Sequence, residues 1–327
     1  MNVVHLTAFG GPEVLVPAEV PDPEPRPGHV VVDLVRAALN HRDVWIREGR
    51  PGPLPAVLGS DGAGVVSEVG AGVDGISVGD EVVINPSLDW GDREDAPGPD
   101  FRILGVPDQG TYAERIAIAA HQVRPRPAEW SWDECAAFPL AGLTAWRALR
   151  LAGAAPGRRI LVTGAGGGVA TFIVQIGAAL GATMVATTGS GAKIARVREL
   201  GAAEAVDYHD PEWPRRIGPV HAAIDSTGGS GLDAVIGTLA RGGVLVSFGD
   251  TAREQTTVDL AEVFLEWRAI QGTTMGSPRE FDALLGHIAT AGWRPAIDST
   301  HALADAAEAH RRLVNPDRIG KVVLAIR

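Results

Sequence analysis

The pattern of apolar and polar positions changes at about residue 125 of the chain. Before that point, short runs rich in valine, such as "HVVVDLVRAAL", "GAGVVSEVG" and "DEVVINP", are separated by Gly, Pro and Asp. β-Branched residues favour strands, and Gly, Pro and Asp favour the turns between strands. The first part of the chain is therefore predicted to form a small barrel or sandwich of short strands.

After residue 125, brief apolar strands alternate with helical stretches. The strands are "RRILVTG", "TMVATT", "EAVDY", "HAAIDS" and "GVLVSFG". Apolar strands that alternate with helices are typical of a doubly wound α/β fold, in which helices cover both faces of a parallel sheet. This part of the chain is therefore predicted to be a Rossmann-type domain.

The last part of the chain, from about residue 268, predicts one more strand, "AIQGTTM", two helices at residues 278–290 and 302–313, and a final strand, "GKVVLAI". This segment is too short to form a domain by itself, so we expect it to pack on the first part of the chain. We therefore expect residues 1–126 and 268–327 to form one domain, and residues 127–267 to form the other.

A glycine-rich turn lies at the start of the alternating region. Residues 158–182, "RRILVTGAGGGVATFIVQIGAALGA", read as a buried strand, a glycine cluster and an apolar helix. Glycines let the backbone approach a pyrophosphate, and the free N–H groups at the helix start receive its negative charge. A glycine cluster alone also suits any tight turn, but the strand and helix around it favour a dinucleotide. We expect contacts to the cofactor at Gly164, Gly167, Gly168 and Val169.

The second strand of the alternating region indicates which dinucleotide is bound. In NAD-binding domains an Asp or Glu at the end of this strand contacts the ribose hydroxyls. Here the strand ends in "VATTGSGAKIAR", which offers Thr188, Ser190 and Lys193 in place of an acid. Hydroxyls and a cation suit a 2′-phosphate, so the sequence predicts a preference for NADPH. A solvated Lys193 on an amphipathic helix remains the alternative.

Composition and charge restrict the class of partner. The chain has 40 acidic and 29 basic residues, a net charge of 29 − 40 = −11, and the charges are interspersed, which argues against nucleic acid as a partner. The first twenty residues do not resemble a signal peptide, and no uncharged apolar run is long enough to span a membrane. We therefore expect a cytoplasmic protein that acts on a small molecule.

The single cysteine, Cys135, excludes an internal disulfide and a four-cysteine zinc site. Cys135 lies near the start of a predicted helix, whose dipole would lower the pKa of the thiol. A buried packing thiol is the commoner outcome.

Several motifs occur in the order of a known family. They are "GSDGAGVVSEVGAGVDGISVGDEVV", "GTYAE", "AAFPLAGLTAWRAL", "VTGAGGGV" and "DSTGG". Along nearly its whole length the chain resembles the medium-chain dehydrogenase/reductase superfamily, and within it the zinc-free, quinone oxidoreductase-like branch. The resemblance implies a GroES-like, β-barrel-type catalytic domain, a doubly wound Rossmann nucleotide-binding domain and a homodimer.

The same resemblance bears on a metal site. Where zinc-dependent relatives have a cysteine and a histidine as ligands, this chain has Asn40 and Ser60, and Asp61 follows in place of a glutamate. The third cysteine falls near "FPLAGLT", which offers no good ligand, and the lobe with four cysteines is replaced by a loop that has none. Amide and hydroxyl groups do not replace thiolate and imidazole on tetrahedral zinc, so no metal is expected. An ion held by His41 and Asp61 is the alternative.

Without a Lewis acid, a conjugated acceptor is the better substrate, because it delocalises the charge that hydride transfer adds. The resemblance implies that Asn40 donates to the substrate carbonyl and that Trp45 stacks on a planar acceptor, although simple core packing of Trp45 is equally open. It also implies cofactor contacts at Thr144, Tyr208, Phe248 and Gly249.

The sequence thus predicts an NADPH-dependent, metal-independent oxidoreductase that reduces quinones or α,β-unsaturated carbonyl compounds. Two alternatives are an alcohol dehydrogenase with a non-standard metal site and a nucleotide-binding protein without turnover.

Overall fold

The computed structural model describes residues 1–49 and 52–327 and divides into two compact units. The first unit comprises Met1–Ala141 and Ser277–Arg327, and the second comprises Gly142–Gly276. Both boundaries lie later in the chain than the 126/127 and 267/268 expected from the sequence. The first boundary lies later than predicted because helix α2 (Trp132–Ala137) packs on strands of the first unit.

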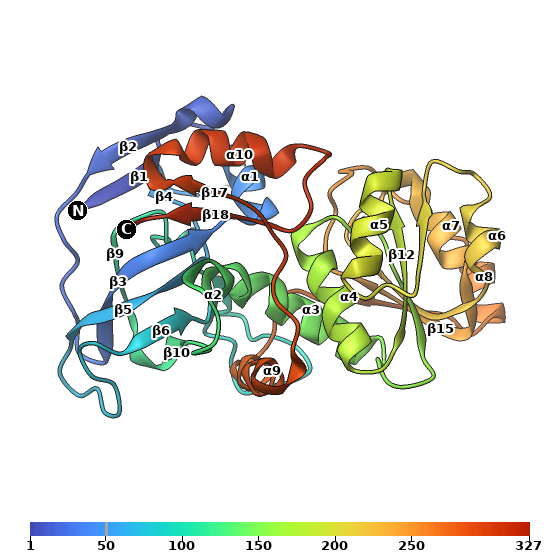
Figure 1. The fold of residues 1–327 in the computed structure, drawn as a ribbon, viewed down its shortest axis with the longest axis horizontal. Coiled ribbons are helices and arrows are strands. Elements are labelled where there is room, and N and C mark those ends of the chain that lie inside the picture. The colour runs from blue at the N-terminus through green and yellow to red at the C-terminus, as the bar shows by residue number, and fades with distance from the viewer. Residues whose placement is uncertain (50–51) are drawn as a thin grey trace. The chain divides into compact units, whose positions relative to one another are not determined.

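The first unit is built on a seven-stranded sheet with the order β10-β6-β5-β3-β18-β17, and β9 also pairs with β3. Its strands are β3 (His29–Ala38), β5 (Asp61–Val69), β6 (Glu81–Ile84), β9 (Arg115–Ala119), β10 (Val123–Pro125), β17 (Ile297–Ala302) and β18 (Lys321–Ala325). Pairing of β18 with β3 returns the end of the chain to the sheet formed by its beginning (Figure 1).

Smaller sheets and short helices complete the first unit. One sheet has β1 (Asn2–Leu6) between β2 (Leu15–Glu19) and β4 (Ala56–Val57), and another pairs β7 (Ser87–Leu88) with β8 (Arg102–Ile103). The helices are α1 (His41–Arg47), α9 (Pro278–Ala291) and α10 (Ala306–Val314), together with α3 (Pro139–Leu151), which continues into the second unit. Buried Leu6, Leu39, Leu58 and Leu324 belong to one of its apolar cores.

The second unit is a six-stranded parallel sheet with the order β13-β12-β11-β14-β15-β16. Its strands are β11 (Arg159–Val162), β12 (Thr183–Thr188), β13 (Glu204–Asp207), β14 (Val220–Asp225), β15 (Leu239–Ser247) and β16 (Ala269–Gly272). The helices are α4 (Gly168–Ala179), α5 (Gly191–Glu199), α6 (Trp213–Ile217), α7 (Leu232–Gly237) and α8 (Leu260–Leu265). The strand order reverses between β11 and β14, which is the switch point where such sheets bind nucleotides.

The structure confirms the predicted α/β class, with a GroES-like unit and a Rossmann-type unit. Two details of the tail differ from the prediction. Strand β16 pairs with β15 and so belongs to the second unit. Strand β17 was missed because its sequence, "IDSTHA", is polar, as suits an outer strand that pairs only with β18 among the described strands.

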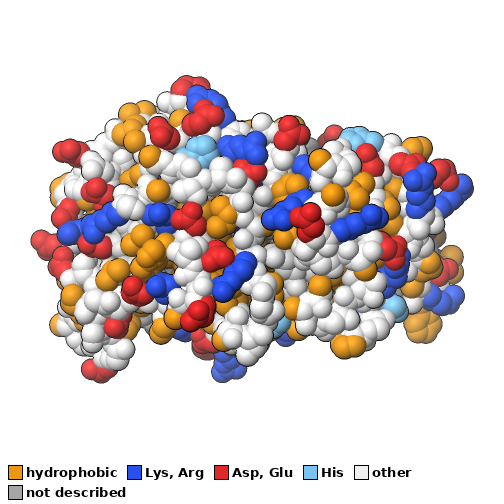
Figure 2. Space-filling model, viewed as in Figure 1, with side chains coloured by type: hydrophobic (Ala, Val, Ile, Leu, Met, Phe, Trp, Pro, Cys, Tyr) orange, Lys and Arg blue, Asp and Glu red, His pale blue; other side chains and the backbone are white. Residues whose placement is uncertain are grey.

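Acidic and basic side chains are interspersed on the face of the molecule shown in Figure 2. None of the helices within the described residues combines the length and apolar character needed to span a membrane.

Candidate active site

The glycine-rich turn joins β11 to α4 and is held by both neighbouring strands. The N–H of Thr163 donates to the Ile224 carbonyl at the end of β14, and that of Ala165 donates to the Thr187 carbonyl in β12. Gly164 has φ +58°, a conformation that favours glycine. A Cβ on Gly167, the residue that caps α4, would lie 3.3 Å from the Gly164 carbonyl oxygen. The turn is therefore tight and fixed in place.

The start of α4 suits an anion. The first N–H groups of a helix, here those of Gly168, Val169 and Ala170, have no acceptor within the helix and carry the positive end of its dipole. With the close approach that glycine allows, this is the chemistry of a pyrophosphate site. The turn therefore fits a dinucleotide as the sequence predicts.

A buried carboxylate that the sequence reasoning missed connects the two sides of the switch point. Asp225, at the end of β14, accepts hydrogen bonds from the Thr163 hydroxyl at 2.5 Å and from the N–H groups of Thr227 and Gly228 at 3.0 and 2.8 Å. Its carbonyl accepts from the N–H of Phe248 at 3.0 Å. Asp225 thereby fixes the loops after β11 and β14 and the chain after β15, where Phe248 and Gly249 were predicted to meet the cofactor.

The residues predicted to bind a 2′-phosphate gather at the end of β12. The Ser190 hydroxyl caps α5 by accepting from the Lys193 N–H at 3.4 Å. The N–H of Tyr208 donates to the Thr188 carbonyl at 3.0 Å. A Cβ on Gly189 would lie 2.5 Å from the Tyr208 hydroxyl oxygen, so the tyrosine ring reaches over this turn.

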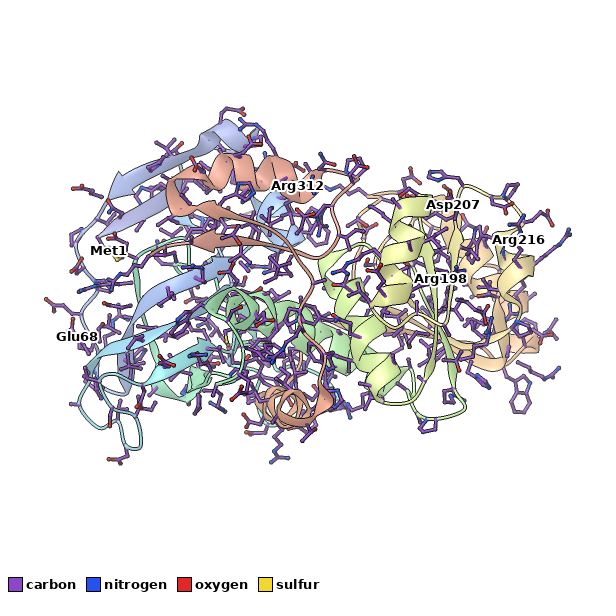
Figure 3. The ribbon with its side chains drawn as sticks, viewed as in Figure 1. Met1, Glu68, Arg198, Asp207, Arg216 and Arg312 are labelled. Atoms are coloured by element: carbon purple, nitrogen blue, oxygen red, sulfur yellow. The ribbon has the colours of Figure 1, made fainter. Side chains whose placement is uncertain are left out.

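An acidic residue lies near the end of β12, at the end of the neighbouring strand β13. Asp207 ends β13, and Figure 3 labels it together with Arg198 of α5. The Asp207 carboxylate accepts hydrogen bonds from the N–H of His209 and from its ring Nδ1, at 2.9 and 2.8 Å. The hydrogen bond from the His209 N–H lowers the pKa of Asp207. This carboxylate is thus engaged with His209.

Thr144 lies in α3 within the second unit, where it is buried and contacts the sulfur of Met275 at 3.9 Å. Next to this contact, Arg147 donates to the Thr273 hydroxyl at 3.1 Å. These contacts hold the chain just before the boundary at Gly276 against α3. The role of Thr144 beside the nicotinamide ribose stays a prediction.

In the first unit, strand register brings three polar side chains together. Ala38 in β3 pairs with Asp61, the first residue of β5. Ala38 also pairs antiparallel with Val323 in β18, which places Lys321, two residues earlier, opposite Asn40, two residues later. Residues far apart in the sequence thus meet at one end of the sheet because their strands end there.

The contacts within this cluster are short and buried. Lys321 Nζ donates to Asn40 Oδ1 at 2.6 Å and to Asp61 Oδ2 at 2.9 Å. Asn40 Nδ2 donates to Asp61 Oδ2 at 2.9 Å, and the N–H of Leu140 donates to Asp61 Oδ1 at 2.7 Å. The exposed fractions are 6% for Asn40, 2% for Lys321 and 0% for Asp61. We call Asn40, Asp61 and Lys321 the buried polar cluster.

The sequence reasoning singled out Asn40 but did not find Lys321. A signal was present, because Lys321 is one of only two lysines among the 29 basic residues and opens an otherwise apolar strand. Asp61 was considered only as a metal ligand, whereas the structure makes it the partner of Lys321.

The side chains at the positions where zinc-dependent relatives have their ligands do not fit zinc. Asn40 Oδ1 and both oxygens of Asp61 already accept hydrogen bonds. The Ser60 hydroxyl donates to the Leu104 carbonyl at 2.6 Å and accepts from Arg42 at 2.9 Å. Within residues 1–49 and 52–327, no group of three or more His, Cys, Asp or Glu side chains could hold a metal ion. An ammonium, an amide and a hydroxyl are not a zinc donor set.

Buried hydrogen bonds hold the start of α1 next to Asn40. The Asp43 carboxylate accepts from the Asn40 N–H at 2.8 Å and from the Tyr112 hydroxyl at 3.1 Å, and that hydroxyl also lies 3.2 Å from His310 Nε2. Burial raises the pKa of Asp43, raises that of Tyr112 well above its ordinary value, and lowers that of His310 to about 3. Tyr112 therefore stays protonated and acts as a structural anchor for the start of α1.

Two further residues of the first unit that the sequence analysis named, Trp45 and Cys135, pack against or among other side chains. The half-buried ring of Trp45 packs edge-on against His41, with centroids 5.2 Å apart. Cys135 is buried, and burial raises the pKa of its thiol to about 11. The favoured interpretation of Cys135 as a buried packing thiol therefore holds, and the alternative of a pKa lowered by the helix dipole does not.

The chain matches two family models, each over part of its length. Residues 26–128 match the alcohol dehydrogenase GroES-like domain, and residues 168–290 match the zinc-binding dehydrogenase family.

Similar proteins carry two kinds of name. The zinc-type alcohol dehydrogenase-like protein YogA of Leptosphaeria maculans is 34% identical and aligns over 92% of this chain and 90% of its own. A quinone oxidoreductase of Pseudomonas aeruginosa is 32% identical over 98% of each chain. A solved NAD-dependent alcohol dehydrogenase superimposes with a TM-score of 0.95 at 40% identity over 100% of both chains. The chain therefore belongs to the medium-chain dehydrogenase/reductase superfamily of nicotinamide-dependent oxidoreductases.

Proposed function

We propose that this protein is a metal-independent, NADPH-dependent reductase of activated acceptors, namely quinones or α,β-unsaturated carbonyl compounds. The observation that carries the proposal is the Lys321 ammonium, which bridges Asn40 and Asp61 where zinc-dependent relatives need ligands. It supports membership of the zinc-free, quinone oxidoreductase-like branch, in keeping with the name of the Pseudomonas relative.

The class of acceptor follows from how strongly the site can stabilise negative charge on the reacting carbonyl oxygen. A zinc ion supplies several kcal/mol of charge stabilisation to a reacting carbonyl oxygen, and a neutral amide N–H supplies less. A conjugated acceptor needs less help, because the charge spreads over the conjugated system and leaves an enolate or hydroquinone oxygen. Asn40 donates its amide N–H to that oxygen, and the α-carbon of an enone then takes a proton from solvent.

The cofactor, when bound, supplies the hydride from its nicotinamide ring. Gly164, Gly167, Gly168 and Val169 hold its pyrophosphate at the start of α4. Thr188, Ser190, Lys193 and Tyr208 hold the 2′-phosphate at the end of β12, and the absence of an acid at the end of that strand supports NADPH over NADH. In this proposal Thr144, Phe248 and Gly249 contact the nicotinamide half, and Trp45 stacks on a planar acceptor.

The proposal includes a homodimer formed through the edge of the second unit's sheet. Strand β16 ends the order of that sheet, and the apolar side chains of α8 and β16 are exposed, with Leu260 at 72% and Trp267, between the two elements, at 75%. An open strand edge beside exposed apolar side chains is the surface that a second copy covers by symmetric pairing.

A second candidate function is an alcohol dehydrogenase, because several similar proteins carry that name, YogA and the solved structure described above among them. It requires a metal ion, for which His41 and Asp61 are the candidate ligands. Asp61 already binds the Lys321 ammonium, which argues against this candidate.

The test is oxidation of NADPH by chelator-treated protein with quinones, enones and saturated ketones, with NADH in parallel. We expect turnover with conjugated acceptors and NADPH, and little with NADH or saturated ketones. Reduction of saturated ketones only after metal is restored would support the alcohol dehydrogenase. Tight NADPH binding without turnover of any acceptor would instead indicate a nucleotide-binding protein without catalytic activity.

A further inference from the structure

The amide of Asn40 has a donor end and an acceptor end, and its neighbours determine which end points where. Lys321 Nζ lies 2.6 Å from Oδ1, and Asp61 Oδ2 lies 2.9 Å from Nδ2. An ammonium only donates hydrogen bonds and an ionised carboxylate only accepts them. Turning the amide by 180° would place its NH2 group against the ammonium and its oxygen against the carboxylate. Two attractive contacts would become repulsive, so only one orientation is stable.

The frame around the amide is itself fixed. Asp61 cannot swing, because its other oxygen accepts the Leu140 N–H at 2.7 Å. Lys321 is held between Asn40 and Asp61 on β18, which is flanked by β3 and β17, and 2% of its surface is exposed. The backbone of Asn40 is held in turn by the carboxylate of Asp43 at 2.8 Å. The direction of the amide group is therefore determined by the protein before any ligand arrives.

The Asn40 amide has one N–H beyond the one that Asp61 accepts among the described residues. Asn40 Nδ2 carries two hydrogens, and Asp61 uses one of them. Asn40 is also the most exposed member of the buried polar cluster, at 6%. The ammonium on Oδ1 draws electron density from the amide, and such chains of hydrogen bonds strengthen one another in a buried site. The second N–H is thus both directed and made a stronger donor.

We propose that Lys321 is a positioning residue that, with Asp61 as its frame, orients and polarises the Asn40 amide so that its second N–H meets the carbonyl oxygen of the hydride acceptor. The proposal rests on the proposed function for the identity of that acceptor. The choice of lysine fits this role, because a compact ammonium bridges two adjacent oxygens, whereas the planar guanidinium of arginine spreads its donors. Lys321 therefore does more than neutralise Asp61.

The kinetic test separates positioning from neutralisation. Lys321→Met removes the ammonium, and we expect kcat with a conjugated acceptor to fall about a hundredfold, as when one donor to a developing oxyanion is lost, while the KM for NADPH is unchanged. The double variant Asp61→Asn with Lys321→Met removes both charges. We expect it to regain thermal stability but not kcat. If the double variant regains wild-type kcat, Lys321 only neutralises Asp61 and the proposal is wrong.

A matched control is available in the same unit. Arg312 forms a two-point ion pair with Asp298, at 2.6 Å for each contact, and does not touch the cluster. We expect Arg312→Met to lower thermal stability and leave kcat unchanged. A fall in kcat as large as that of Lys321→Met would show that loss of stability alone explains the kinetic effect, and would overturn the proposal.

A second readout does not depend on turnover. The chain has four asparagines, so 15N-asparagine labelling gives four side-chain amide pairs, and Asn40→Ser identifies the pair of Asn40. We expect this pair to exchange slowly with solvent in the wild type and to shift and exchange faster in Lys321→Met. An unchanged pair overturns the proposal. The signals of this pair could change in Lys321→Met although the wild-type protein reduces no conjugated acceptor. That result would leave the orienting role of Lys321 intact and reject the proposed function instead.

Discussion

The buried polar cluster of the first unit and the apolar face of the second depart from the usual distribution of side chains in opposite ways. In the first, an ammonium and a carboxylate are almost fully buried. In the second, Leu260, Phe264, Leu265, Trp267 and Ile270 are exposed on α8, β16 and the turn between them. Burying charge and exposing apolar surface both cost free energy. In our proposals each has a use, the first as a fixed hydrogen-bond donor and the second as a contact for a second copy of the chain.

The two regions also differ in whether their groups find partners within their own chain. Every charge of the cluster is matched within the unit, so the cluster is already organised as it stands. The apolar face has no such match among the described residues of its own chain. This difference predicts that disruption of the cluster acts on folding, whereas disruption of the face acts on association.

The largest effect is expected for Asp61→Ala. Loss of this carboxylate leaves the Lys321 ammonium buried without its counter-ion, which in comparable sites lowers the free energy of unfolding by about 3–5 kcal/mol. Urea unfolding followed by circular dichroism measures the change. The control is Asp95→Ala, which breaks the exposed ion pair with Arg93 and should leave the unfolding midpoint where it was. A loss below about 1 kcal/mol for Asp61→Ala would mean that the cluster is not held by its charges.

A smaller effect is expected on the apolar face. Trp267→Glu places a charge in the proposed dimer contact, and loss of one large aromatic anchor typically costs about 2 kcal/mol or more of binding free energy. We expect the dimer to dissociate into folded monomers, with little change in the circular dichroism spectrum. Analytical ultracentrifugation over a range of concentrations measures the dissociation constant.

The control for the face is Val78→Glu, another exposed apolar side chain that lies in the first unit. It should leave the dissociation constant unchanged. A wild-type protein that is monomeric at all concentrations, or a Trp267→Glu variant that dimerises as well as the wild type, would remove the proposed partner from this face.

The strand, turn and helix of the proposed nucleotide site could be predicted from the sequence because they are local, while the cofactor contacts assigned to them stay predictions. The glycine turn, the strand before it and the helix after it are contiguous, and Thr188, Ser190 and Lys193 lie within six positions of one another. The family resemblance gave Asn40 its place in the catalytic unit. The predicted fold class of both units is likewise confirmed, since most of their strands and helices have a short-range pattern of their own.

The cluster around Asn40 could not be predicted in the same way. Lys321 and Asp61 are 260 positions apart and meet only because β18 pairs with β3. A hydrophobic pattern identifies a strand but does not choose its partner, and the same ambiguity hid the pairing of β16 with β15. Strand β17 has a polar sequence and so lacks even that pattern. Asp225 was missed for a related reason, because its partner Thr163 lies on another strand.

The smallest effect is expected at the nucleotide site itself, where binding is shared among many backbone groups. Lys193→Met removes one cation from the proposed 2′-phosphate contact and should weaken NADPH binding at least about tenfold, since a hydrogen bond to a charged group is worth about 1.5 kcal/mol or more. NADH binding should not change. Arg196→Met is the control on the same helix, because Arg196 is paired with Glu199 at the surface. Titration of cofactor fluorescence measures both affinities, and an equal loss for NADH and NADPH would mean that Lys193 does not distinguish them. Because a lost 2′-phosphate contact leaves the pyrophosphate turn intact, Lys193→Met tests the choice of cofactor separately from the capacity to bind one.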